Sequence, residues 1–208
     1  MQNEKYRTQK VQFCILHFAF CILHSAMKLP NHTALKEWST VIDALGRGEQ
    51  VILIRKGGIA DRNFGVEADR FYLYPTYFHQ QQNEPANVTI THWCEVVRTW
   101  RTREIDLLAS FVAIPREALE ARYRFRPDQA LHVIGVRAFA LPHACTISVK
   151  PEYLGCKSWV SIDDAIDVDG STPVLSDDVL GERLDDVNRV IPSERSESRD
   201  PLRIHEVL

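Results

Sequence analysis

The chain has 208 residues, of which 45% are hydrophobic and 25% are charged, and its formal net charge is −3. These values are typical of one soluble domain with or without tails. Two of the five cysteines lie in an N-terminal repeat, and no Cys-x-x-Cys occurs, so a disulfide framework is disfavoured and a reducing cytoplasm is favoured.

A tandem repeat occupies the N-terminal segment, where residues 13–19 (FCILHFA) are followed directly by residues 20–26 (FCILHSA). Its apolar run is too short for a membrane span. Two interpretations compete: a secretory signal, which the preceding cations favour, or translated repetitive DNA upstream of a start at Met27. We expect residues 1–26 to lie outside the folded domain.

The first half of the body predicts a helix and two strands. Apolar residues three or four apart predict a helix over residues 33–45. Residues 51–54 (VILI) form a continuous apolar run typical of a buried strand. A second strand is predicted over 69–74, and the pair Gly57–Gly58 permits a tight reversal, so we expect these two strands to form a hairpin.

The second half predicts a long strand over residues 88–100 and then a helix from Thr102 through Phe111. Pro115 suits the first position of another helix. A further strand is predicted over 131–141, bounded by Pro142. This order predicts an α+β fold: a single domain with a mostly antiparallel sheet and a few helices, and disordered tails at both ends.

The C-terminal part is acidic and then compositionally simple. Residues 151–190 contain 3 Lys and Arg against 10 Asp and Glu, whereas residues 27–150 contain 16 against 13. We therefore expect a globular domain over 27–165, followed by a disordered tail over 166–208. An alternative is an acidic arm that competes for the protein's own basic face.

Four separated segments carry a family resemblance. The segments are 35–38 (LKEW), 54–59 (IRKGGI), 73–80 (LYPTYFHQ) and 155–160 (GCKSWV). In this order they resemble an uncharacterised bacterial family, domain-of-unknown-function family 1802, over roughly residues 28–162. The resemblance implies a bacterial protein without an established reaction, associated in some proposals with nucleic-acid functions. Gly48 and Arg55 also resemble part of a small RNA-binding barrel of the PUA-like kind, although Gln50 and Leu53 depart from that pattern.

A catalytic interpretation uses Glu67, Asp69 and His79, with Lys56 nearby. If the two predicted strands pair, two carboxylates, an imidazole and a cation flank one small sheet, as a metal-dependent hydrolase or nuclease requires. The alternative is a polar hairpin with a satisfied histidine.

A metal interpretation uses two His-x-Cys pairs, His92 with Cys94 and His143 with Cys145. Residues i and i+2 of a strand share a face, so two such pairs on neighbouring strands would supply the four ligands of a zinc site. The alternative is two unrelated half-buried pairs. Cys156, beside Lys157, is a candidate nucleophile or a small residue in a tight turn.

Arginine is concentrated in the middle of the chain, where residues 98–126 hold seven arginines against four acids. Arginines with interleaved aromatic residues suit contacts to phosphates and stacking on bases. Helix surfaces also carry such arginines.

We therefore predict a bacterial, cytoplasmic domain that binds nucleic acid and does not associate with membranes. A metal-dependent hydrolase and a protein-interaction module with an acidic tail are the alternatives. No cofactor or oligomeric state follows from these residues. The predicted binding residues are Arg55, Lys56, Tyr74, Tyr77, His79, Lys157 and Trp159.

Overall fold

A computed structural model of the chain describes residue 29 and residues 32–56, 64–76, 85–124 and 128–191. Within these ranges, seven strands form one sheet that is accompanied by four α-helices. The strands are β1 (Thr33–Trp38), β2 (Ile52–Arg55), β3 (Arg70–Thr76), β4 (Asn87–Thr102), β5 (Leu131–Ser148), β6 (Trp159–Ser161) and β7 (Thr172–Pro173). The α-helices are α2 (Ser39–Gly46), α3 (Ile105–Leu108), α4 (Arg116–Arg124) and α5 (Asp177–Val190).

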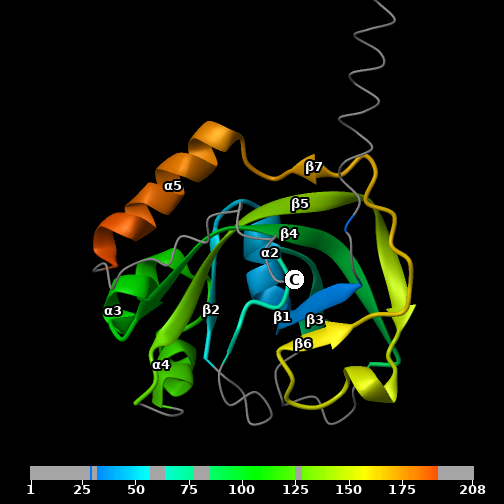
Figure 1. Cartoon of the computed structure of the whole chain (residues 1–208), viewed down its shortest axis with the longest axis horizontal. Helices are drawn as coiled ribbons and strands as arrows, with labels where there is room; N and C mark the ends of the chain where they lie inside the picture. The colour runs from blue at the N-terminus through cyan, green and yellow to red at the C-terminus, as the bar shows by residue number, and fades with distance from the viewer. Residues whose placement is uncertain (1–28, 30–31, 57–63, 77–84, 125–127, 192–208) are drawn as a thin grey trace, which may run out of the picture.

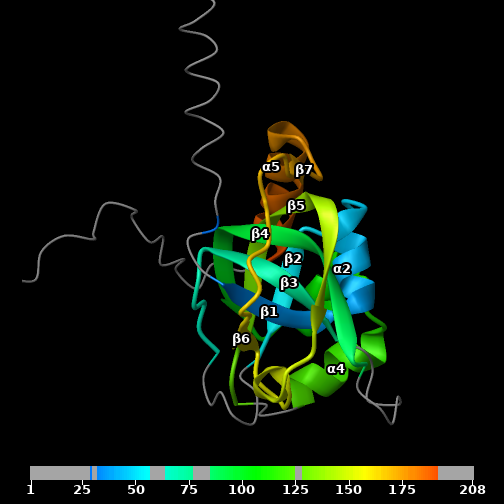
Figure 2. The ribbon, with the colours of Figure 1, turned by 90° about the vertical axis from the view of Figure 1, so that its right-hand side faces the viewer.

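The sheet has the strand order β2-β5-β4-β3-β1-β6, and β7 pairs with β5. Its strand pairs are antiparallel except for β1 with β3. The predicted α+β class with a mostly antiparallel sheet is therefore confirmed. Figure 1 shows that β4 and β5 are long and curved, so that the sheet bends round toward the shape of an open barrel. In Figure 2, α2 lies along one flank of the strands and α5 lies apart from it.

The predicted helix over residues 33–45 is wrong in its first half, because residues 33–38 form β1. This strand lies between β3 and β6, and both neighbours pair with its backbone. Ala34, Leu35 and Glu37 are buried there. Pairing with strands far along the chain outweighs the local helical spacing. The helix begins only at Ser39.

The predicted hairpin between residues 51–54 and 69–74 is also wrong, although both strands exist. β2 pairs with β5, and β3 lies between β4 and β1. Three successive residues of β2 are buried (Ile52, Leu53 and Ile54), so this strand needs apolar cover on both faces. A two-stranded hairpin cannot supply that cover.

β5 continues past Pro142, where the sequence predicts its end. The register explains how proline fits: Ala140 lies opposite His92, whereas Cys145 lies opposite Ile90. Four residues of β5 therefore face one residue of β4. Proline is tolerated at such an irregularity because no regular ladder hydrogen bond requires its missing N–H.

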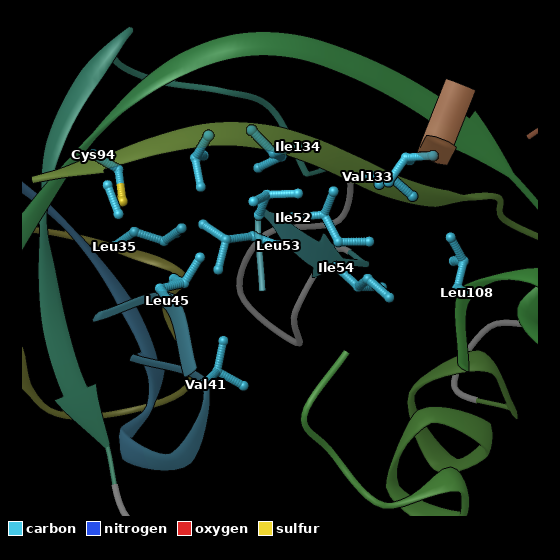
Figure 3. Packing of buried hydrophobic residues seen from close by; sticks show 14 of the residues in the cluster. Leu35, Val41, Leu45, Ile52, Leu53, Ile54, Cys94, Leu108, Val133 and Ile134 are labelled. Carbon is cyan, nitrogen blue, oxygen red and sulfur yellow. The ribbon is translucent and has the colours of Figure 1, made fainter. Parts of the chain in front are cut away.

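One part of the main core lies beneath the arch of β4 and β5, and another part lies between β5 and α5. Figure 3 shows Leu35, Leu45 and Leu53 on this inner side, with Ile134 above them. A second cluster on the outer face contains the stacked rings of Trp93 and Phe139, whose centroids are 4.1 Å apart. On β3 the two clusters alternate, as the period of two requires: Phe71 and Leu73 belong to the main core, and Tyr72 and Tyr74 belong to the outer cluster.

The predicted disordered tail needs correction, because residues 172–173 form β7 and residues 177–190 form α5. Ser176 caps α5 by accepting a bond from the Val179 N–H. Three apolar residues of α5, Leu180, Leu184 and Val187, are buried in the main core. The sequence prediction counted the acids of this segment and missed its apolar stripe.

Part of the acidic charge of α5 faces arginines of the sheet. Asp177 lies 2.8 Å from Arg137, and Asp185 lies 3.4 Å from Arg98. The acidic segment is therefore packed against the protein's own domain. None of the helices in the described ranges is both long and apolar enough to cross a membrane.

Candidate nucleic-acid interface

The four sequence motifs converge, in their described parts, on one end of the sheet. β1 and β3 run in parallel and finish together, since Trp38 lies opposite Thr76. β2 finishes beside them, because the Arg55 guanidinium donates to the backbone oxygen of Lys36. β6 begins there at Trp159, opposite Leu35. We call this end of the sheet, where β1, β2 and β3 finish and β6 begins, the motif end.

A buried ion pair joins β1 to β2 at the motif end. The Glu37 carboxylate is 1% exposed and lies 3.5 Å from the Arg55 guanidinium, which is 13% exposed. Its Oε1 also accepts a 2.9 Å bond from the Trp38 N–H. β1 and β2 are separated by three strands in the sheet order, so this pair bridges the two sides of the bent sheet.

A row of nitrogen-bearing side chains crosses three strands on the inner wall of the motif end. Arg55 of β2 is paired with His132 of β5, which is paired in turn with Arg101 of β4. Paired residues of an antiparallel ladder share a face. His132 and Ile134 are two residues apart on β5 and share a face, so the row lies on the same face as Ile134, which belongs to the main core. Arg101 is exposed and His132 is half-buried.

The surroundings of His132 favour the neutral form of its imidazole. Burial lowers the pKa of its imidazole, and the positive charge of Arg101 lowers it further. Its ring meets the ring of Phe64 edge-on, with centroids 5.5 Å apart. Phe64 stacks in turn on Trp159 at 6.0 Å. His132 is therefore the half-buried end of a series of three packed rings.

Two further cations extend the row. Lys56 follows β2 directly and is partly buried, and Arg103 follows β4 and is exposed. Burial lowers the pKa of Lys56, the carboxylate of Asp128 opposes this, and the charge of Arg103 lowers it again. The two cations are thus close enough to repel each other. Arg103 also donates a 2.8 Å bond to the Asp128 backbone oxygen.

The other predicted binding residues are distributed over both faces of the sheet. Trp159 is buried in the inner core and donates to the Gly65 oxygen at 2.9 Å. Tyr74 is buried in the outer cluster beneath the Lys36 ammonium, 5.9 Å from its ring centroid. Lys157 is exposed before β6. Tyr74 and Trp159 therefore do not line one pocket, and Tyr77 and His79 lie outside the described residues.

The described catalytic candidates lie at the other end of β3. Glu67 and Asp69 precede that strand and are exposed. β3 spans seven residues from Arg70 to Thr76. At a rise of about 3.3 Å per residue, the start of β3 is roughly 20 Å from the motif end. His79 lies outside the described ranges, so a meeting of all three residues stays a prediction.

The metal candidates are divided between the two faces. Cys94 is fully buried in the inner core, and this burial raises the pKa of its thiol, which disfavours the thiolate that zinc requires. Cys145 packs against the outer cluster, and His143 is exposed. His92 is half-buried; its Nδ1 lies 2.8 Å from the Thr91 hydroxyl. The described residues contain no group of three or more His, Cys, Asp or Glu side chains suited to a metal ion.

The predicted arginine-rich stretch also separates into parts. Arg116 and Arg124 both pair with Glu120 along α4, and Arg98 pairs with Asp185. Arg101 and Arg103 lie at the motif end. The side chains of Arg122 and Arg126 lie outside the described residues. Cys156 is exposed in the turn before Lys157.

Two residues of the motif end were missed as functional candidates. Glu37 belongs to the first motif, but no role was predicted for it, because this segment was expected to be a helix. The signal was its position between Lys36 and Trp38 in that motif. His132 opens a strand and has no neighbouring motif residue, and only the pairing of β5 with both β2 and β4 places it between Arg55 and Arg101.

The chain matches a known family over most of its length. The family is described as a domain of unknown function (DUF1802), and its model covers residues 34–186. The chain belongs to the DUF1802 family. The match includes β1 and most of α5, which agrees with a domain that extends beyond residue 165. No curated protein is similar to this member of DUF1802.

Solved structures similar to this DUF1802 protein include the ASCH protein of Zymomonas mobilis and two of its single-residue mutants. The unmutated ASCH protein is 8% identical, with a TM-score of 0.37, over 58% of this chain and 88% of that chain. A serine-to-alanine mutant of that protein is also 8% identical, with a TM-score of 0.38, over 59% of this chain and 92% of that chain. These values are too low to transfer a function.

Proposed function

We propose that this DUF1802 protein is a nucleic-acid-binding domain whose interface is the motif end. The observation that carries the proposal is the set of cations at this end of the sheet, where Arg101 lies beside His132 and Arg103 lies near Lys56. A phosphate backbone is bound by cations that cluster on one surface. Such a cluster does not require the whole chain to have a positive net charge. The chain's formal charge of −3 is compatible with such a local site.

The proposal places the protein in the bacterial cytoplasm, where nucleic acids are found. The three cysteines of the described ranges, Cys94, Cys145 and Cys156, are all free, which suits a reducing compartment. Arg55 acts within this interface mainly by supporting it, because its guanidinium is occupied by Glu37 and the Lys36 oxygen. Lys56, the next residue along the chain, is the one that contacts the phosphates of the ligand in this proposal.

The test is binding of a fluorescent mixed-sequence oligonucleotide, as RNA and as DNA, by the full chain at several salt concentrations. We expect binding that weakens steeply with salt, because bound phosphates release counterions. The Lys56→Glu substitution should weaken binding about tenfold or more, since it replaces an attraction by a repulsion.

Arg47→Glu is the matched control, because Arg47 is an exposed arginine that precedes β2, at the opposite end of that strand from Lys56. It should leave affinity nearly unchanged. Absence of binding by the unmodified chain at low salt, or equal losses in both variants, would contradict the proposed interface.

A further inference from the structure

Part of the motif end lies on the inner, concave side of the bent sheet. Arg101 and His132 share the inner face of the sheet with Ile134, which Figure 3 shows beneath the arch of the strands. A duplex carries its phosphates on the outside of a cylinder, and it is usually read by a helix or β-ribbon that enters a groove. Side chains on an inner wall are poorly placed for that approach.

The width of the row suits one nucleic-acid strand. β2, β5 and β4 are successive neighbours, so Arg55 and Arg101 are separated by two strand spacings, or about 10 Å. Lys56 and Arg103 extend the same edge by one residue on β2 and two on β4. Such a short edge offers contacts to a few neighbouring phosphates of one backbone.

An aromatic surface accompanies these cations. His132 is half-buried, with one edge supported by Phe64 and with Arg101 beside it. Histidine rings and guanidinium planes both stack on unpaired bases. Trp159 holds Phe64 from behind through its own stacked ring and its bond to Gly65. The His132 ring is thus supported in place before a ligand arrives.

We propose that the motif end selects single-stranded over double-stranded nucleic acid, with a base stacked on His132 and phosphates held by Lys56, Arg101 and Arg103. This inference rests on the proposed nucleic-acid binding. Stacking platforms combined with cationic grooves are the usual means of binding single strands without a fixed sequence.

The first experiment compares a 12-nucleotide RNA without self-complementarity, and the DNA of the same sequence, each alone and annealed to its complement. The full chain is used, with fluorescence anisotropy as the readout. We expect each single strand to bind at least about tenfold more tightly than its duplex. Equal or tighter duplex binding would overturn the selectivity while leaving nucleic-acid binding intact. If neither form binds, the proposed function itself fails, and the selectivity fails with it.

The second experiment tests the stacked base. His132→Ala should weaken single-strand binding by about fivefold to a hundredfold and leave the salt dependence unchanged, because no phosphate contact is removed. His132→Phe retains an aromatic ring and should recover most of the loss. Circular dichroism is the control that checks whether both variants are folded. A His132→Ala affinity equal to that of the unmodified chain, or no recovery with Phe, would show that no base stacks there.

Discussion

His92 and His132 are both half-buried, and this has a consequence for stability that can be measured. Burial lowers the pKa of each imidazole below its usual 6.5; the Asp43 carboxylate opposes the shift at His92, whereas Arg101 adds to it at His132. Below pH 6.5 the unfolded chain therefore binds protons more readily than the folded one. Folding stability gained above that pH is lost as the pH falls.

We expect the urea midpoint of unfolding to decrease between pH 7.5 and pH 5.5. The His132→Gln variant should show a smaller decrease than the unmodified chain, because one of the two shifted groups is gone. A midpoint that rises on acidification in this window would contradict the neutral state of these imidazoles.

Glu37 and Arg55 form the second residue-scale case. Removing one partner of a buried ion pair leaves the other charge buried without compensation. Glu37→Ala should therefore destabilise the fold by about 3–5 kcal/mol in chemical denaturation. The double variant Glu37→Met/Arg55→Met should recover much of this loss, since both charges are removed.

Glu49→Ala is the control for that experiment, because Glu49 pairs with Arg47 on the open surface and the pair is more than half exposed. It should leave stability almost unchanged. The matching single variants are Glu37→Met and Arg55→Met. Additive losses in these two, without recovery in the double variant, would show that the two side chains do not stabilise the fold as a pair.

At the scale of elements, α5 is part of the core. Leu184 is buried, and its side chain packs so closely over Gly135 that a Cβ there would lie 2.8 Å from it. Leu184→Ala should cost about 2–5 kcal/mol, because it leaves a cavity between α5 and β5. Val179 on the same helix is 39% exposed, so Val179→Ala should lower the free energy of unfolding only slightly. Equal thermal shifts for both variants would mean that α5 does not contribute to the core.

The elements also show what local sequence predicts well. Residues 52–54 are apolar and residues 131–136 are mostly apolar, so β2 and the first part of β5 were predicted correctly. Residues 33–38 form a strand only because β3 and β6 flank them, and no local pattern contains that information. α5 was missed because its five acids dominate the composition, whereas its apolar stripe consists of a few residues four or three apart.

At the scale of the whole molecule, the sequence predicted the class of fold and not the pairing. The predicted hairpin used the shortest available connection, but β2 pairs 80 or so residues along the chain, as Ile52 opposite Gly135 illustrates. The motifs nevertheless lie together at the end of the sheet that we propose as the interface. Arg55, Lys56 and Trp159 lie at the motif end, whereas Glu37 and His132 join them only through the strand order.

That distant pairing has a consequence during synthesis. β2 is complete once residue 55 has been made, but its partner segment in β5 is added only when residues 132–135 follow. Until then, Ile52, Leu53 and Ile54 have no neighbouring strand to cover them. Domains rich in such long-range pairs fold slowly, and their exposed apolar strands are prone to aggregation. We therefore expect a nascent chain of this protein to expose the apolar side chains of β2 until residues 132–135 have been made.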